Sequence, residues 1–213
     1  MLSKVYSFTF SPFQENTYIL YDDTREAVIV DPSCLAQHEK EELAKYIEDN
    51  KLIVKALLQT HTHLDHVFGS AYVKRKFGVK MYMHRADLPV LSDVEIRCKT
   101  WGIAGYEPVE ADEFLEEGEQ FKFGNTTLEI VHVPGHAPGH IAFINTFDKY
   151  VIGGDCLFKG SVGRTDFPLC SHEELINSIK TKFYNLPDEY VVYAGHMEPT
   201  TIGYEKKNNP FTK

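Results

Sequence analysis

Short apolar segments rich in Val, Ile, Tyr, Phe and Thr open the chain. They cover residues 4–10, 16–21 and 26–33 and are separated by Pro, Asn and Asp, a pattern that predicts strands joined by turns. Residues 38–50 place apolar side chains at helical spacing among charged ones, and residues 52–60 form a largely apolar run. We therefore expect a sheet, then a helix, then a buried strand.

Strand-like apolar segments and helix-like spacing continue along the rest of the chain. Residues 67–78 predict a helix closed by Gly78, whereas glycines and prolines break up residues 85–118, where we expect irregular, helix-rich structure. Further strands are predicted at 79–84, 120–124, 126–133, 140–146, 150–154 and 190–195, and further helices at 173–183 and 200–209.

Strand-rich blocks at both ends, each accompanied by helices, predict the fold class. Two sheets can bury their apolar faces against each other and cover their outer faces with helices. The expected fold is an αββα four-layer sandwich with two mixed sheets packed face to face. Because no repeat, linker or low-complexity segment interrupts the pattern, residues 1–213 are interpreted as a single domain.

Composition and charge restrict the partners. A chain with 43% hydrophobic and 25% charged residues is ordinary for a globular protein. A net charge of -9 disfavours nucleic acid and anionic membranes and favours a small-molecule substrate. The opening MLSKVYSFTF is too polar for a signal peptide, and Cys34, Cys98, Cys156 and Cys170 form no CxxC pair. We expect free thiols and a cytoplasmic location.

The segment HTHLDH, residues 61–66, directly follows an apolar run and concentrates metal-ligand chemistry. His61, His63, Asp65 and His66 lie within six residues. Imidazole and carboxylate groups bind zinc and similar ions, and so many of them together are costly without a compensating cation or solvent. The alternative to a metal site is that these residues form a solvated loop.

Three other strand ends carry the same kind of residue, which argues against that alternative. His136 follows a strand broken by Pro134 and Gly135, Asp155 follows an apolar strand and two glycines, and His196 follows the last strand. Loops at the ends of neighbouring strands can converge on one point. Two neighbouring metal ions are therefore a reasonable expectation from the residues.

The motifs THTHLDH, PGHAPGH, GGD and AGH, in this order, resemble those of the metallo-β-lactamase superfamily. PGHAPGHIAF, GDCLFKGSVGRTDFP and GHMEPTTIGYEKKNNPF are most similar to its hydroxyacylglutathione hydrolase, or glyoxalase II-like, branch. The resemblance implies the αββα fold. It also implies a first metal ion on His61, His63 and His136, a second on Asp65, His66 and His196, and Asp155 bridging both.

The resemblance implies a hydrolase that cleaves thioesters with a metal-bridging hydroxide. Two divalent cations lower the pKa of a shared water from about 16 towards about 7, with zinc the expected metal and iron or manganese also suited to these ligands. Asp65 would orient the hydroxide as well as bind metal. Asp31 resembles the buried aspartate that supports the metal loops, although an aspartate before Pro32 can also serve a local turn.

Lys159 and Arg164 follow Asp155 closely and are candidates for binding a substrate carboxylate. A structural Arg164, tied to Asp166, is the alternative. The better-known glyoxalase II enzymes continue into a C-terminal helical domain that binds glutathione, and residues 197–213 offer no such domain. The substrate is thus expected to be an anionic thioester whose thiol is left open, as is the oligomeric state.

Two other functions remain open at this point. A persulfide dioxygenase of the same superfamily would use one iron held by His61, His136 and Asp155, with the remaining residues around it. A non-catalytic metal-binding module is disfavoured because structural metal sites are closed and often rich in cysteine, and no cysteine joins this cluster. Opening of a β-lactam or lactone ring would use the same nucleophile.

Overall fold

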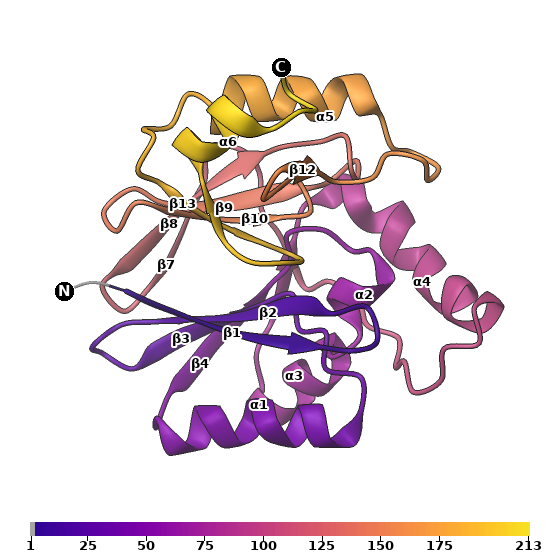
Figure 1. Ribbon diagram of the computed structural model, residues 1–213. Helices are drawn as coiled ribbons and strands as arrows, with labels where there is room; N and C mark the ends of the chain where they lie inside the picture. Colours follow the sequence, from indigo (N-terminus) through magenta and orange to yellow (C-terminus); the bar gives the residue numbers. More distant parts are fainter. Residues whose placement is uncertain (1–2) are drawn as a thin grey trace.

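The computed structural model describes residues 3–213; of the opening segment, Met1 and Leu2 lie outside that range. Two six-stranded sheets form its centre (Figure 1). The first sheet has the order β1 (Lys4–Phe10), β2 (Glu15–Tyr21), β3 (Glu26–Val30), β4 (Ile53–Leu58), β5 (Met81–Met83) and β6 (Glu113–Phe114). Strands β1 to β3 pair antiparallel and β3 to β6 pair parallel, so the sheet is mixed.

The second sheet is mixed as well. Its order is β14 (Thr200–Thr201), β13 (Val191–Ala194), β10 (Tyr150–Gly154), β9 (Ile141–Asn145), β8 (Thr126–His132) and β7 (Gln120–Phe123). In this sheet β10 and β13 pair parallel, and the other neighbouring strands pair antiparallel. A separate hairpin of β11 (Leu157–Phe158) and β12 (Ser161–Val162) follows β10.

The helices lie on the outer faces of the two sheets. Figure 1 shows α1 and α3 below the first sheet, α5 and α6 above the second, and α4 at one side. Their bounds are α1 (Gln37–Asp49), α2 (Leu64–Val67), α3 (Ser70–Phe77), η1 (Arg85–Asp87), α4 (Leu88–Thr100), α5 (His172–Ser178), η2 (Ile179–Phe183) and α6 (Ile202–Asn208). No helix within residues 3–213 combines the length and apolar character that crossing a membrane requires.

Period-two alternation along the strands builds the layers. On β3, Ala27 and Ile29 pack towards α1, whereas Val28 and Val30 pack towards the second sheet. On the far face of the second sheet, a third cluster packs β9, β10 and β13 against α5, η2 and α6. Because successive side chains of a strand point to opposite faces, these strands are apolar on both sides. The αββα prediction is confirmed.

The segment 85–118 is more regular than its glycines and prolines indicate. Helix α4 runs for 13 residues with a proline in its first turn, where the missing amide proton is harmless. Only Leu91, Val94 and Cys98 of α4 are buried, so its apolar stripe is narrow. Helix 173–183 also differs from expectation, because its second half, η2, continues as a π-helix.

Strand ends from both sheets meet at one edge of the sandwich. Asp31 and His61 follow the parallel strands β3 and β4, and Asp155 and His196 follow the parallel strands β10 and β13. The backbone amide of Ile141 donates to the carbonyl of Thr60 at 2.8 Å, and that of Asn16 donates to the carbonyl of Gly195 at 2.6 Å. These two bonds join the sheets beside the histidine-rich loops.

Candidate metal centre

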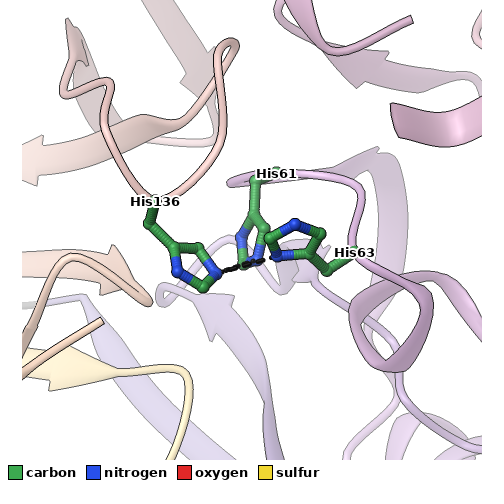
Figure 2. A group of neighbouring side chains, drawn as sticks. All are labelled: His61, His63 and His136. Carbon is green, nitrogen blue, oxygen red and sulfur yellow. Dashed lines mark hydrogen bonds between the residues drawn. The ribbon is translucent and has the colours of Figure 1, made fainter. Parts of the chain in front are cut away.

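Three of the predicted ligands converge from two different loops. Figure 2 shows His61 and His63, from the loop after β4, facing His136 from the loop after β8. Nδ1 of His63 lies 2.8 Å from Nε2 of His136, which lies 3.2 Å from Nε2 of His61. Chain segments more than 70 residues apart therefore place three imidazole nitrogens at one point.

The hydrogen bonds behind these rings fix which nitrogens carry lone pairs. Nδ1 of His136 donates to the carbonyl of Arg164 at 2.8 Å. The Thr60 hydroxyl donates to Asp31 at 2.5 Å, so Nδ1 of His61, 3.1 Å from that hydroxyl, must act as the donor to it. In neutral rings, both Nε2 atoms are then unprotonated and face each other. This arrangement is unfavourable by itself and suits a shared cation.

A second group lies beside the first. Asp65 and His66 come from α2, and His196 comes from the loop after β13. Nε2 of His196 lies 3.2 Å from Oδ2 of Asp65. One donor atom from each of the three residues falls within 4.8 Å of the others, which is the spacing of a metal-ligand set.

Asp155 lies between the two groups. Its Oδ1 is 3.4 Å from Nε2 of His66, and its Oδ2 is 3.6 Å from Nε2 of His136 and 3.5 Å from Nε2 of His196. Within residues 3–213, Oδ1 of Asp155 and Nε2 of His66 are buried without a hydrogen-bond partner. Buried polar atoms are normally satisfied, so these two atoms fit a bound cation. All seven predicted positions thus meet in one cluster.

The first group is held in the unprotonated form that binds metal. Burial, together with the neighbouring His66 and His136, lowers the pKa of His61 well below its usual value. Burial and the neighbouring His136 lower the pKa of His63 to about 3. A metal ion binds the neutral imidazole, so no proton competes for these nitrogens near neutral pH.

The second group concentrates negative charge. Burial opposes ionisation of Asp155, but His66 and His196 outweigh it and lower the pKa of Asp155 well below its usual value. Burial also opposes the charged form of His196, yet Asp155 and Asp65 raise the pKa of His196 to about 10. The carboxylates thus attract positive charge, which either protonated histidines or divalent cations can supply.

Asp31 lies behind the cluster and orients it. Its Oδ1 accepts from the amide of Thr60 at 2.7 Å, and its Oδ2 lies 3.0 Å from Nδ1 of His66. The backbone of Asp31 has φ of 47°, an uncommon value for a residue other than glycine. Its partners are distant in sequence rather than amides of the local turn, which fits the supporting role predicted for it. Carboxylates behind metal-binding histidines typically hold the ring in place.

Two buried acidic residues near the site were missing from the sequence prediction. Asp87 accepts from the amides of Thr62 at 2.5 Å and Gly139 at 2.9 Å, and so ties the loop after β4 to the loop after β8. Glu15 is fully buried, and its Oε1 lies 3.5 Å from Nδ1 of His66. Burial raises the pKa of Glu15 well above its usual value.

His140 has a structural position. Its Nε2 accepts from the backbone amide of Asp155 at 3.0 Å, and its ring stacks on His61 with 4.8 Å between centroids. His140 is thus a hydrogen-bonded residue that supports Asp155. Gly195 is also constrained, because a side chain there would overlap the Asp155 carboxylate.

A cavity of about 420 Å³ opens onto the cluster and exposes Asp65, His63, His136, Asp155 and His196 to it. Arg164 lines this cavity, but its guanidinium also binds both oxygens of Asp166, at 2.7 and 2.8 Å. Lys159 is not among the lining residues and pairs with Glu198 at 2.7 Å. Of the two predicted substrate-binding residues, Arg164 thus reaches the cavity and Lys159 does not.

Comparison with known proteins identifies relatives that cover most of the chain. The chain is 41% identical over 201 residues to hydroxyacylglutathione hydrolase GloC of Haemophilus influenzae, covering 93% of each. A crystal structure described as BLEG-1 B3 metallo-beta-lactamase superposes with a TM-score of 0.90, at 32% identity over 99% of this chain and 100% of that one. One described as TTHA1623 in a di-iron-bound form gives 0.86, at 36% identity over 97% and 100%.

A family model described as the metallo-beta-lactamase superfamily matches residues 10–196, which include the whole cluster. This match and the 41% identical relative agree with the observed fold. The chain belongs to the metallo-β-lactamase superfamily.

Proposed function

We propose that this protein is a hydrolase that holds two divalent metal ions and cleaves thioesters such as S-acylglutathione. The observation that carries the proposal is the position of Asp155, whose two oxygens lie 3.4 Å from His66 and 3.6 Å from His136. One carboxylate thus reaches donors of both groups. The relative described as a hydroxyacylglutathione hydrolase supports the substrate, and the neighbour described as di-iron-bound supports two ions.

The ligand sets follow from the two groups. His61, His63 and His136 would hold one ion, Asp65, His66 and His196 the other, and Asp155 would bind both. Nδ1 of His196 lies 3.2 Å from the carbonyl of Gln14, so its Nε2 is the atom directed to the cluster. Zinc suits this mixture of imidazole and carboxylate, and iron or manganese accept it as well.

Bound at these positions, the two cations would supply Lewis acidity that lowers the pKa of water and polarises a substrate carbonyl. The chain itself supplies orientation. Asp65 faces the cavity, and His196 and His66 lower its pKa against the effect of burial, so it is a carboxylate near neutral pH. Asp65 would accept a hydrogen bond from the attacking water and direct it towards the carbonyl.

The residues lining the cavity fit a substrate with a good leaving group. Apart from the metal-ligand residues, the polar side chains lining it within residues 3–213 are Thr62, Ser161, Arg97 and Arg164. None of these is an efficient proton donor near neutral pH. A thiolate leaves without protonation, whereas an amine or alkoxide does not. The site therefore favours thioesters over amides.

Arg164 would meet an anionic part of a small-molecule substrate in place of Asp166, because it is the predicted substrate-binding residue that lines the cavity. Lys159 would contribute only if its ammonium left Glu198.

We also propose a cytoplasmic location, which the four free cysteines support because thiols persist in a reducing compartment. Residues 1–213 would act as one domain.

Metal analysis combined with two activity assays tests the proposal. We expect two equivalents of zinc, iron or manganese per chain and hydrolysis of S-lactoylglutathione, measured by release of free thiol. Glutathione persulfide should cause no oxygen uptake. One iron per chain with oxygen uptake would instead establish a persulfide dioxygenase, and tight metal binding without turnover would establish a binding module.

A further inference from the structure

Three of the aromatic side chains that line the cavity contact one another. Phe13 lies in the turn between β1 and β2, Trp101 directly follows α4, and Phe167 lies in the loop between β12 and α5. We refer to Phe13, Trp101 and Phe167 as the aromatic wall. Its residues come from three separate parts of the chain, so the fold brings them together at the cavity rather than in a local cluster.

The rings of the aromatic wall form a continuous path to the metal centre. The centroid of Phe13 lies 6.4 Å from that of Trp101, with the ring planes 18° apart. Trp101 lies 6.3 Å from Phe167, which in turn meets the ring of His63 edge-on at 5.7 Å. A group attached near the reacting carbonyl can therefore contact the wall while the carbonyl lies at the cluster.

Two rings of the aromatic wall are also partly exposed where they line the cavity. Trp101 retains 47% of its accessible surface and Phe13 retains 37%. A contiguous exposed apolar patch beside a site commonly marks a binding surface. Trp101 contacts the other two rings and also lines the cavity. Part of its ring surface therefore remains available to a ligand.

The rings are also held in position by neighbouring side chains. Phe13 packs on the buried ring of Phe68 at 5.7 Å. The guanidinium of Arg164 lies 4.0 Å from the centroid of Phe167, and that of Arg97 lies 5.3 Å from it. Rings fixed in advance lose little conformational entropy when a ligand binds.

The positive charges beside the wall, on Arg97 and Arg164, already have acidic partners. Arg97 pairs with Asp93, and Arg164 pairs with Asp166. What the wall itself offers to a substrate is therefore ring surface rather than charge. Rings prefer other rings in offset or edge-on arrangements, beyond the gain from burial alone.

We propose that the aromatic wall binds a flat, apolar group of the substrate and makes thioesters that carry an aromatic ring the preferred substrate class. This inference rests on the proposed function, because it names the substrate of the same site. The ring could belong to the acyl half or to the thiol half of the thioester. The chemistry that recognises it is the same in both cases.

Kinetics with two matched pairs of thioesters test the preference. S-mandeloylglutathione against S-lactoylglutathione varies the acyl half, and S-benzyl thioacetate against S-ethyl thioacetate varies the thiol half. We expect kcat/KM to favour the aromatic member about tenfold or more in at least one pair, a discrimination typical of apolar pockets. The pair that shows it identifies the half that meets the wall.

The Trp101→Ala variant should lower that preference, the ratio of kcat/KM within a pair, about tenfold. Phe147→Ala is the matched control, because Phe147 is 74% exposed and does not line the cavity. It should leave both pairs unchanged. Equal kcat/KM within both pairs, or a preference that survives Trp101→Ala, would overturn the inference.

A binding measurement separates this inference from the proposed function. Trp101 is the only tryptophan in the chain, so intrinsic tryptophan fluorescence reports directly on the wall. Titrating the metal-loaded protein with 3-phenylpropionate should shift the emission to shorter wavelength and saturate, whereas propionate should not. Phe13→Leu keeps the tryptophan and should weaken the response severalfold.

Failure of the proposed function and failure of the aromatic wall would give different results. A saturating shift without turnover of any thioester would reject the proposed function and keep the aromatic wall as a binding site. Thioester turnover without a shift, and without aromatic preference, would reject the aromatic wall alone.

Discussion

The His66→Ala variant is expected to lower kcat/KM for thioester hydrolysis by about a thousandfold. His66 is fully buried, its Nε2 faces Asp155 and its Nδ1 bonds Asp31. Its loss would remove one ligand of the second proposed ion, together with the contact to Asp31. A catalytic metal contributes several kcal/mol to transition-state stabilisation, and each factor of ten corresponds to about 1.4 kcal/mol. Steady-state kinetics on purified protein, with metal content measured in parallel, provide the readout.

Two further variants make this result specific. His196→Ala removes a ligand of the same proposed ion at a half-buried position, so it should reduce activity comparably with less effect on folding. His38→Ala removes an exposed histidine of α1 and should change neither activity nor metal content. If His66→Ala kept most of its activity with a single iron per chain, the one-metal alternative would replace the present account.

Removing the metal ions is expected to lower the melting temperature by roughly 10 °C. Within the cluster, unprotonated Nε2 atoms of His61 and His136 lie 3.2 Å apart, and the Asp155 carboxylate is buried beside them. A ligand at a thousand times its Kd stabilises a fold by about 4 kcal/mol. For a chain of this length, each kcal/mol shifts Tm by about 2–4 °C.

Differential scanning calorimetry of chelator-treated protein, before and after addition of zinc chloride, measures this shift. Calcium chloride is the control, because calcium prefers sites built wholly of oxygen ligands. A melting temperature that zinc leaves unchanged would show that the cluster is stable without metal. The histidines would then have to be paired by hydrogen bonds alone.

The predicted ligands share a signal that is visible in sequence. Each follows an apolar strand directly or within a few residues, and parallel strands such as β10 and β13 bring their carboxyl ends to one edge. The apolar runs that predict these strands therefore also indicate that Asp155 and His196 meet. For this reason, both the αββα layers and the gathering of the seven residues could be anticipated before any coordinates.

Other parts of the site depend on tertiary contacts that leave no local pattern. Glu15 reaches His66 because the start of β2 pairs with His196 through an isolated bridge. Asp87 joins two loops, yet it lies in a segment whose glycines and prolines conceal the helices around it. Trp101 reaches the cavity only because the 13-residue helix α4 carries it there.

The position of Arg164 shows that residue type alone does not assign a role. It lines the cavity as predicted, but it also binds Asp166 and packs on Phe167. Lys159 precedes it by only five residues and pairs with Glu198 instead. Proximity in sequence to Asp155 was therefore a weak guide to which basic side chain faces the cavity.

An anomalous difference map from crystals of the zinc-loaded protein, recorded at the zinc absorption edge, tests the central claim most directly. The account predicts two peaks per chain, one among His61, His63 and His136 and one among Asp65, His66 and His196, with Asp155 adjoining both. A single peak confined to one group, or no peak at Asp155, would contradict it.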